Sequence, residues 1–194
     1  TNGYTTYGCL NNPMKLNKRV LALWRTILLE DAGSCLVLKG KNLDNKRAQE
    51  NVLSCLCATD VTRERIIFYG QTRHREHLAT YNMIDIALDP WPYTGGITTF
   101  EALWMGVPVV TCCGPTFAGK HACTHLKNTG NDAWVARSFD EYRRVALALA
   151  DDVVSLDEIR RELRERVRKS GLCDTERFSI EFEKMLYRCA SSSR

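Results

Sequence analysis

The sequence predicts an α/β protein built on a doubly wound parallel sheet, and two observations carry this prediction. Short β-rich runs alternate with helical patterns along most of the 194 residues, as in chains of βαβ units. Two runs, residues 35–38 and 107–111, are continuously apolar, as strands buried on both faces are. Ligands of such sheets bind outside the carboxyl ends of the strands. Chemistry is therefore expected directly after Leu10, Gly70, Leu88 and Cys113.

Hydrophobic periodicity sets the expected elements. Strands are expected over residues 4–10, 34–38, 66–70, 84–88, 107–113 and 134–136. Helices are expected over residues 17–30, 44–58, 75–83, 98–105, 119–127, 138–150, 155–169 and 175–189. We expect one domain over residues 1–194, with a Rossmann-like core over 1–150 and C-terminal helices over 151–190.

Charge and hydropathy argue against two classes of partner. The net charge of +4 is mild, and the basic run over residues 160–169 alternates with acids at helical spacing. This pattern indicates a solvated helix face with ion pairs rather than a nucleic-acid site. No stretch of about 18 apolar residues is present, so no membrane span is expected. The first residues lack the pattern of a signal peptide and a starting Met, which suggests a chain cut from a longer one.

The nine cysteines are expected to be buried, reduced thiols rather than metal ligands or disulfides. No CxxC pair occurs, and Cys55 and Cys57 lie on different faces of a helix. Reduced thiols indicate a reducing compartment, so a cytoplasmic or nucleocytoplasmic location is expected. Four of the nine fall in strand-like runs: Cys9, Cys35, Cys112 and Cys113.

The segment over residues 89–108 combines a strand end, a Pro-stiffened turn, two glycines and a helix start. Gly95 and Gly96 let a backbone approach a ligand closely. The amides of a helix N-terminus form a seat for a diphosphate, to which Thr98 and Thr99 can add hydroxyl donors. Glu101 has two interpretations: with Thr98 it forms a capping box, or it accepts hydrogen bonds from ribose hydroxyls.

Residues 114–121 imitate the P-loop of NTPases but depart from it at two positions. His121 stands where a Ser or Thr must bind magnesium, and Pro115 has no N–H to donate. A dehydrogenase is also disfavoured, because no GxGxxG occurs and Lys39 ends the second strand in place of an acid. No Asp-x-Asp pair is present, so no metal is expected at the site.

Several separated motifs resemble the O-GlcNAc transferase and SPINDLY-like glycosyltransferase family, in the family's order and over nearly the whole chain. The loop Gly-Gly-x-Thr-Thr-x-Glu-Ala-Leu-Trp-Met-Gly-Val-Pro over residues 95–108 is the most specific of them. The others are residues 8–15, 67–70, 76–78, 117–121 and 172–174. The resemblance implies the C-terminal, UDP-sugar-binding lobe of a GT-B glycosyltransferase. The family's N-terminal lobe and tetratricopeptide repeats are absent from these residues.

The resemblance also implies roles for individual residues. Lys15 matches the family's essential lysine, a catalytic cation that stabilises the charge on departing UDP. His74 falls where animal members carry a lysine, Gly96 replaces a histidine, and Ile97 replaces a usual threonine. The implied nucleotide-sugar site comprises Asn12, Thr72, His74, His77, Gly95, Gly96, Ile97, Thr98, Thr99, Glu101, Lys120 and His121.

The implied function is inverting transfer of GlcNAc from UDP-GlcNAc to Ser and Thr hydroxyls of proteins. UDP-GlcNAc would be the donor substrate and no cofactor would be needed. The acceptor and the general base would belong to the missing lobe, so the chain alone is expected to be inactive. Two alternatives stay open. One is a non-catalytic nucleotide-binding or interaction module; the other is a GT-B enzyme for GDP-fucose transfer or UDP-sugar epimerisation.

Overall fold

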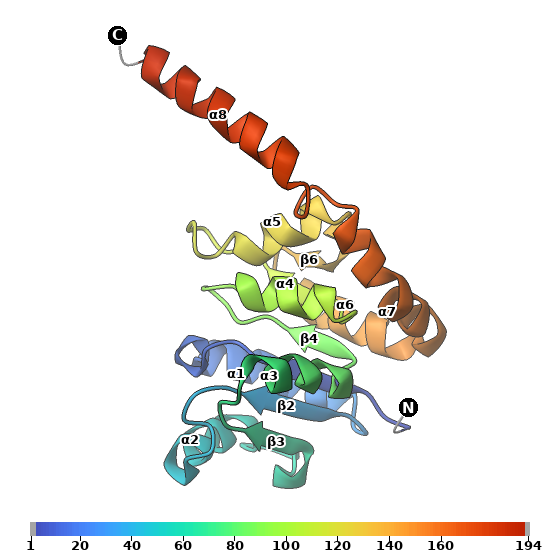
Figure 1. Cartoon of the computed structure of the whole chain (residues 1–194). Helices are drawn as coiled ribbons and strands as arrows, with labels where there is room; N and C mark the ends of the chain where they lie inside the picture. The colour runs from blue at the N-terminus through green and yellow to red at the C-terminus, as the bar shows by residue number, and fades with distance from the viewer. Residues whose placement is uncertain (1–2, 193–194) are drawn as a thin grey trace.

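Six short strands lie side by side in a computed structural model that describes residues 3–192 of the chain (Figure 1). All neighbouring strands pair in parallel, in the order β3-β2-β1-β4-β5-β6. The order reverses at β1, so the doubly wound prediction is confirmed. The strands are β1 Thr6–Cys9, β2 Cys35–Lys39, β3 Ile66–Tyr69, β4 Ile86–Leu88, β5 Val109–Cys112 and β6 Val135–Ala136. The first two and last two residues of the predicted domain lie outside the described part.

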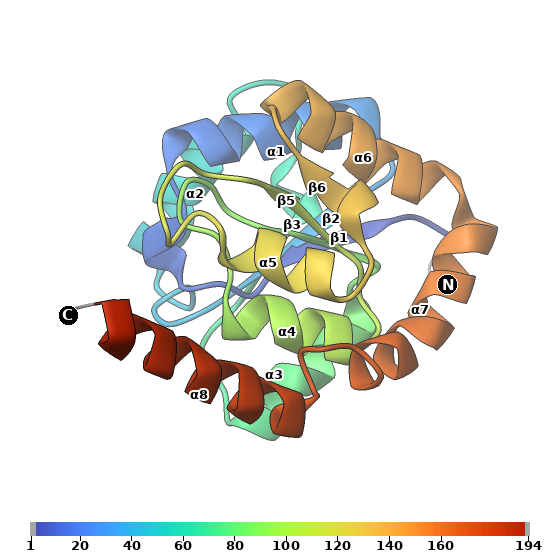
Figure 2. The same ribbon diagram turned by 90° about the horizontal axis from the view of Figure 1, so that it is seen from above.

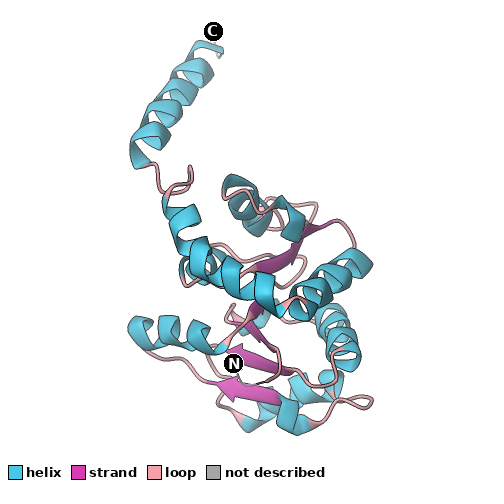
Figure 3. Cartoon of the chain, turned by 90° about the vertical axis from the view of Figure 1, so that its right-hand side faces the viewer, coloured by secondary structure: helices cyan, strands magenta, loops and turns pink. Residues whose placement is uncertain are grey.

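Helices cover both faces of the sheet (Figure 2). One layer holds α1 Lys18–Glu30, α2 Lys46–Leu56 and α6 Phe139–Asp151. The other holds α3 His74–Thr80, α4 Ile97–Trp104, α5 His121–Asn128 and α7 Val153–Arg168. Short 3-10 turns are η1 Pro13–Lys15, η2 Arg63–Arg65, η3 Tyr81–Met83 and η4 Asp132–Trp134. Figure 3 shows the strands enclosed between these helical layers.

Successive strand residues supply two separate hydrophobic cores, because side chains of a strand alternate between the faces of the sheet. On β2, Leu36 and Leu38 pack with α1, α2 and α6, whereas Val37 packs on the opposite side with α4 and α7. On β5, Val110 and Val109 divide in the same way. This double burial explains why the central strands read as continuous apolar runs.

Helix starts follow the predicted boundaries where a polar side chain caps them. Asn17 accepts hydrogen bonds from the amides of Arg19 and Val20 at the start of α1, and Ser138 accepts one from Glu141 at the start of α6. The helix expected over residues 75–83 is instead the short α3 followed by η3.

The C-terminal helix α8, Thr175–Ser192, projects away from the body of the molecule (Figures 1 and 3). No helix within residues 3–192 is long and apolar enough to cross a bilayer. On α7, ion pairs such as Arg166 with Glu162 confirm the prediction of a salt-bridged face. Arg160 departs from it, because its guanidinium donates to the carbonyls of Ile84 and Asp85.

The expectation of reduced thiols throughout is wrong at one pair. Cys113 and Cys123 form a disulfide, with their Cα atoms 6.0 Å apart. The cause is the packing of the first turn of α5 beside the end of β5, which brings together two residues ten positions apart. Cys9 and Cys112 are buried among apolar side chains, as predicted.

A buried tyrosine joins α6 to the carboxyl end of β4. The Tyr142 hydroxyl donates to the carbonyl of Asp89 at 3.0 Å and accepts from Trp24 Nε1 at 3.3 Å. Both rings are fully buried. The hydroxyl therefore satisfies two polar groups that water cannot reach.

We expect Tyr142→Phe to lower the free energy of unfolding by about 1–3 kcal/mol, because it leaves the Trp24 and Asp89 groups unsatisfied. Urea denaturation measures this change. The matched control is Tyr187→Phe on the exposed α8, which should stay within about 0.5 kcal/mol of the parent. Equal stabilities of the two variants would contradict this role of the buried hydroxyl.

Candidate functional site

The candidate site lies at the carboxyl edge of the sheet, where the segments after β1 and β4 face each other. These two strands are neighbours, and the chain leaves β1 toward η1 but leaves β4 toward α4. Strand order reverses here, which is the place where doubly wound sheets bind ligands. Two of the predicted strand ends, Leu10 and Leu88, therefore meet in one site.

Lys15 ends η1 and reaches across to the loop after β4. Its Nζ donates to the Thr94 carbonyl at 2.8 Å and to Asn11 Oδ1 at 3.1 Å, and it lies 4.2 Å from the centre of the Tyr93 ring. Burial lowers the pKa of Lys15, and the charge of Asp89 opposes this shift. An ammonium group has three N–H donors. Two are used inside the protein, and the third has no oxygen acceptor among the residues that the structure describes.

The start of α4 presents free backbone amides. Gly96 is the N-cap, and the amides of Gly96, Ile97 and Thr98 donate no hydrogen bond to any residue that the structure describes. The Gly95 amide differs from the prediction, because it donates to Asp89 Oδ1 at 2.7 Å. Gly95 thus shapes the turn, and the three following amides form the anion seat.

Two polar residues that the sequence analysis left without a role organise this turn. Asp89 is buried and accepts from Gly95, from the Thr111 hydroxyl at 2.7 Å and from Asn11 Nδ2 at 3.4 Å. Asn11 Oδ1 accepts from Lys15 and, at 2.9 Å, from the Thr98 hydroxyl. Asp89 directly follows β4, and Asn11 lies two residues after the end of β1. That position was the available signal.

Glu101 pairs with histidines instead of capping its helix. Its carboxylate oxygens lie 3.4 Å from His77 Nε2 and 3.6 Å from His74 Nδ1. The capping-box interpretation is wrong, because α4 begins at Ile97, before Thr98, and no side chain caps it. Burial lowers the pKa of His77, while the Glu101 carboxylate opposes this shift.

The structure brings some of the other predicted residues to the site and leaves others at its margin. Thr99 is buried beside the Gly95 turn, and its hydroxyl has no hydrogen-bond partner among the residues that the structure describes. His121 lies beside Gly96, in a hollow of about 450 Å³ that Ile97, Phe100 and His125 also line. Thr72 and Lys120 are exposed at the starts of α3 and α5.

The segment over residues 114–120 uses three of its amides internally: Gly114 donates to the Gly119 carbonyl, Gly119 to the Thr116 carbonyl and Lys120 to the Phe117 carbonyl. The segment also supports the turn before α4, because the Thr94 amide and hydroxyl both donate to the Ala118 carbonyl. Residues 3–192 also contain no cluster of three or more His, Cys, Asp or Glu side chains that could hold a metal ion.

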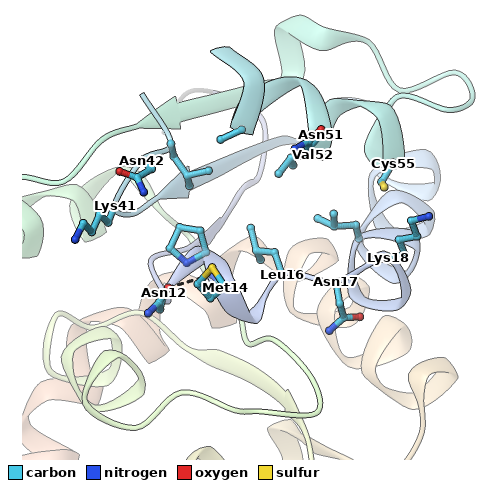
Figure 4. A pocket seen from close by; sticks show the side chains of 14 residues that line it. Asn12, Met14, Leu16, Asn17, Lys18, Lys41, Asn42, Asn51, Val52 and Cys55 are labelled. Carbon is cyan, nitrogen blue, oxygen red and sulfur yellow. Dashed lines mark hydrogen bonds between the residues drawn. The ribbon is translucent and has the colours of Figure 1, made fainter. Parts of the chain in front are cut away.

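Asn12 lies at the edge of a second hollow, an open groove of about 900 Å³ between η1 and α2 (Figure 4). Its Oδ1 accepts from the Met14 amide at 3.0 Å, which caps η1. In the groove, Asn12 and Met14 face Asn42 and Val52 across from them. Asn12 thus borders this groove, and its backbone carbonyl accepts from the Lys15 amide at 2.9 Å.

The sheet order and the two helical layers define a Rossmann-like α/β domain of the doubly wound type. The chain belongs to the Glycosyl transferase family 41, which it matches over residues 2–182. The probable UDP-N-acetylglucosamine–peptide N-acetylglucosaminyltransferase SPINDLY of Petunia hybrida is 38% identical over 184 residues, 94% of this chain and 20% of that protein. The corresponding protein of Solanum lycopersicum is 37% identical over the same shares. The chain thus spans about one fifth of these relatives.

Among solved structures, a lysine-to-methionine mutant of the Thermobaculum terrenum O-GlcNAc transferase superposes with a TM-score of 0.91 at 35% identity. The match covers 97% of this chain and 36% of that one. The predicted fold, the Rossmann-like C-terminal lobe of a GT-B glycosyltransferase, is thereby confirmed.

Gly95 and Gly96 provide a matched pair of substitutions at the turn. A Cβ on Gly95 would overlap Thr99 Oγ1 and lie 2.8 Å from Asp89 Oδ1, whereas a Cβ on Gly96 would meet only His121 Nδ1 at 3.5 Å. We expect Gly95→Ala to lower the free energy of unfolding by about 1–3 kcal/mol through overpacking. Gly96→Ala should change it by about 0.5 kcal/mol or less. Urea denaturation compares the two, and equal losses would contradict the tight fit at Gly95.

Proposed function

We propose that this chain is the donor-binding part of a glycosyltransferase that moves GlcNAc from UDP-GlcNAc to Ser and Thr hydroxyls of proteins with inversion. The observation that carries the proposal is the convergence of Lys15 with the free amides at the start of α4. The relatives named as UDP-N-acetylglucosamine–peptide N-acetylglucosaminyltransferases support this choice of donor and acceptor.

The diphosphate would lie on the amides of Gly96, Ile97 and Thr98, where the helix dipole favours negative charge. The remaining N–H of Lys15 would donate to the same group. As the bond to the sugar breaks, negative charge grows on the departing UDP, and a fixed cation stabilises that charge most in the transition state. Cation and amides together supply the electrostatic work that a metal ion performs in other phosphate sites.

The nucleoside would lie toward α3. Glu101 carries two carboxylate oxygens that can accept hydrogen bonds from ribose hydroxyls, and His77 flanks it. Thr72 and His74, at the entrance to α3, would face the base. The sugar would point the other way, toward Gly96, Lys120 and His121 at the start of α5.

Two alternatives remain: another GT-B reaction and a non-catalytic module. Within the first, the base distinguishes fucose transfer, because an enzyme that uses GDP-fucose would prefer GDP to UDP, whereas an epimerase of UDP-sugars would keep UDP. A non-catalytic module would bind nucleotide or a partner without supporting turnover in any larger assembly. Parallel titrations with UDP and GDP decide the first question.

The chain should bind UDP and UDP-GlcNAc in EDTA, because the seat consists of amides and an ammonium group. Isothermal titration calorimetry measures this directly. Binding that requires magnesium or manganese would contradict the metal-free seat.

Glu101→Ala should weaken UDP binding about tenfold or more, the usual effect of losing a hydrogen bond to a charged group. Glu176→Ala, on the exposed α8, serves as its control.

Residues 1–194 alone should show negligible transfer to peptides, because nothing in a single lobe would hold the acceptor hydroxyl against the donor. Alignment of two reactants is worth roughly 7–11 kcal/mol of barrier. In a longer protein that includes the second lobe, Lys15→Ala should lower kcat about 100-fold or more. Peptide glycosylation assays with both proteins test this. Robust transfer by the 194-residue chain would refute the need for a second lobe.

A further inference from the structure

Asp89 and Asn11 connect the two parts of the proposed diphosphate seat, which are the start of α4 and Lys15. Asp89 Oδ1 accepts from the Gly95 amide at 2.7 Å, directly before the free amides of α4. The same carboxylate accepts from Asn11, whose other amide atom contacts Lys15. The helix start and the lysine come from different strands, and Asp89 lies between them.

Asp89 fixes the orientation of the Asn11 side-chain amide. Because the Asp89 carboxylate can only accept hydrogen bonds when ionised, the NH₂ of Asn11 must face it. The side-chain oxygen of Asn11, Oδ1, then accepts from Lys15 Nζ at 3.1 Å and from the Thr98 hydroxyl at 2.9 Å. The buried acid therefore determines where an acceptor for the ammonium stands.

We propose that Asp89 is a positioning residue for the nucleotide-sugar donor. Its carboxylate fixes the turn at Gly95 and, through Asn11 and its own negative charge, holds the Lys15 ammonium over the start of α4. The proposal rests on the proposed function, because it is the nucleotide-sugar donor of that function that Lys15 and the start of α4 would bind. Asp89 itself would not touch this donor.

The charges around Asp89 agree with this role. Burial raises the pKa of Asp89 from 3.8 to about 7, while the Thr111, Gly95 and Asn11 bonds and the charge of Lys15 oppose the shift. Lys15 is the cation that lowers this pKa. The other titratable groups that interact with Asp89 have their pKa values raised by burial and are neutral near pH 7: Cys9 from β1, Tyr81 from η3 and Tyr142 from α6.

Protonation of Asp89 would change the cluster without collapsing it. Oδ2 faces the Thr111 hydroxyl, which can turn from donor to acceptor, while Oδ1 continues to accept from Gly95. The bonds to Oδ1 would then lose their charge assistance, and Lys15 would lose its counter-charge.

The native pKa of Asp89 lies above the unfolded one, so its contribution to stability is complete below pH 4. It is lost as the pH rises toward 7. The free energy of unfolding of Asp89→Asn should accordingly fall less than that of the parent between pH 4 and pH 7. Urea denaturation at several pH values measures this difference.

The decisive variant is Asp89→Asn, which keeps the shape and an acceptor for Gly95 but removes the charge. Asp85→Asn is the matched control, since Asp85 accepts from the Thr6 amide at the opposite end of β4. Carbon-13 NMR of the Lys15 Cε signal follows the pKa of Lys15 in the free chain. We expect that pKa to fall in Asp89→Asn and to stay unchanged in Asp85→Asn.

UDP affinity provides the second measurement. The titration is made at a pH above the pKa of Lys15 in the parent and above its pKa in Asp89→Asn. There the UDP dissociation constant of Asp89→Asn should exceed that of the parent about tenfold for each unit by which the substitution lowers the pKa of Lys15. Comparison with the parent at the same pH cancels titration of the nucleotide itself. An unchanged Lys15 pKa in a folded Asp89→Asn would overturn the proposal. If UDP binds neither protein, the proposed function fails, and the NMR titration still decides the role of Asp89.

Discussion

Parallel strands gather their carboxyl ends at one edge, and the chain must leave that edge without burying unpaired amides. At the junction of β1 and β4 this is achieved by the Asp89 carboxylate, which takes up the Gly95 amide from inside the protein. The next three amides donate no hydrogen bond within residues 3–192. Thr94, directly before Gly95, accepts from Lys15 through its carbonyl and donates to the Ala118 carbonyl through its hydroxyl, so the segments after β1 and β5 both contact this turn.

Three segments, each following a different strand, contribute to the site. The segment after β1 carries Lys15, the segment after β3 leads to His77, and the segment after β4 forms the start of α4. The proposed diphosphate contacts come from the segments after β1 and β4, whereas the proposed base contacts come from the segment after β3. Changes in the α3 entrance could alter the base while the diphosphate seat stays intact, so the fold alone does not select one nucleotide sugar. This is why titration with different nucleotides is informative.

Much of the fold was predictable, because burial on both faces leaves continuous apolar runs in the central strands, and Asn17 and Ser138 mark real helix starts. The partners of Asp89 were not, since Asn11 lies 78 residues away and only the sheet brings the two together. The capping box failed for a local reason. The backbone turns into α4 already at Gly96, which leaves Glu101 beside His77 instead of at the helix end. The disulfide was not predicted because Cys113 and Cys123 are separated by a loop, and only the packing of α5 beside β5 brings them together.

The projecting helix α8 should unfold locally at a lower free energy than the sheet does. Its side chains from Thr175 to Ser191 are exposed, so little of its helicity derives from burial. A helix of this length without packing is only marginally stable in water. Its amides should therefore exchange with solvent long before those of β1 and β2, through local fraying that leaves the sheet folded. A protease would meet this segment first, and its removal would leave both hydrophobic cores intact.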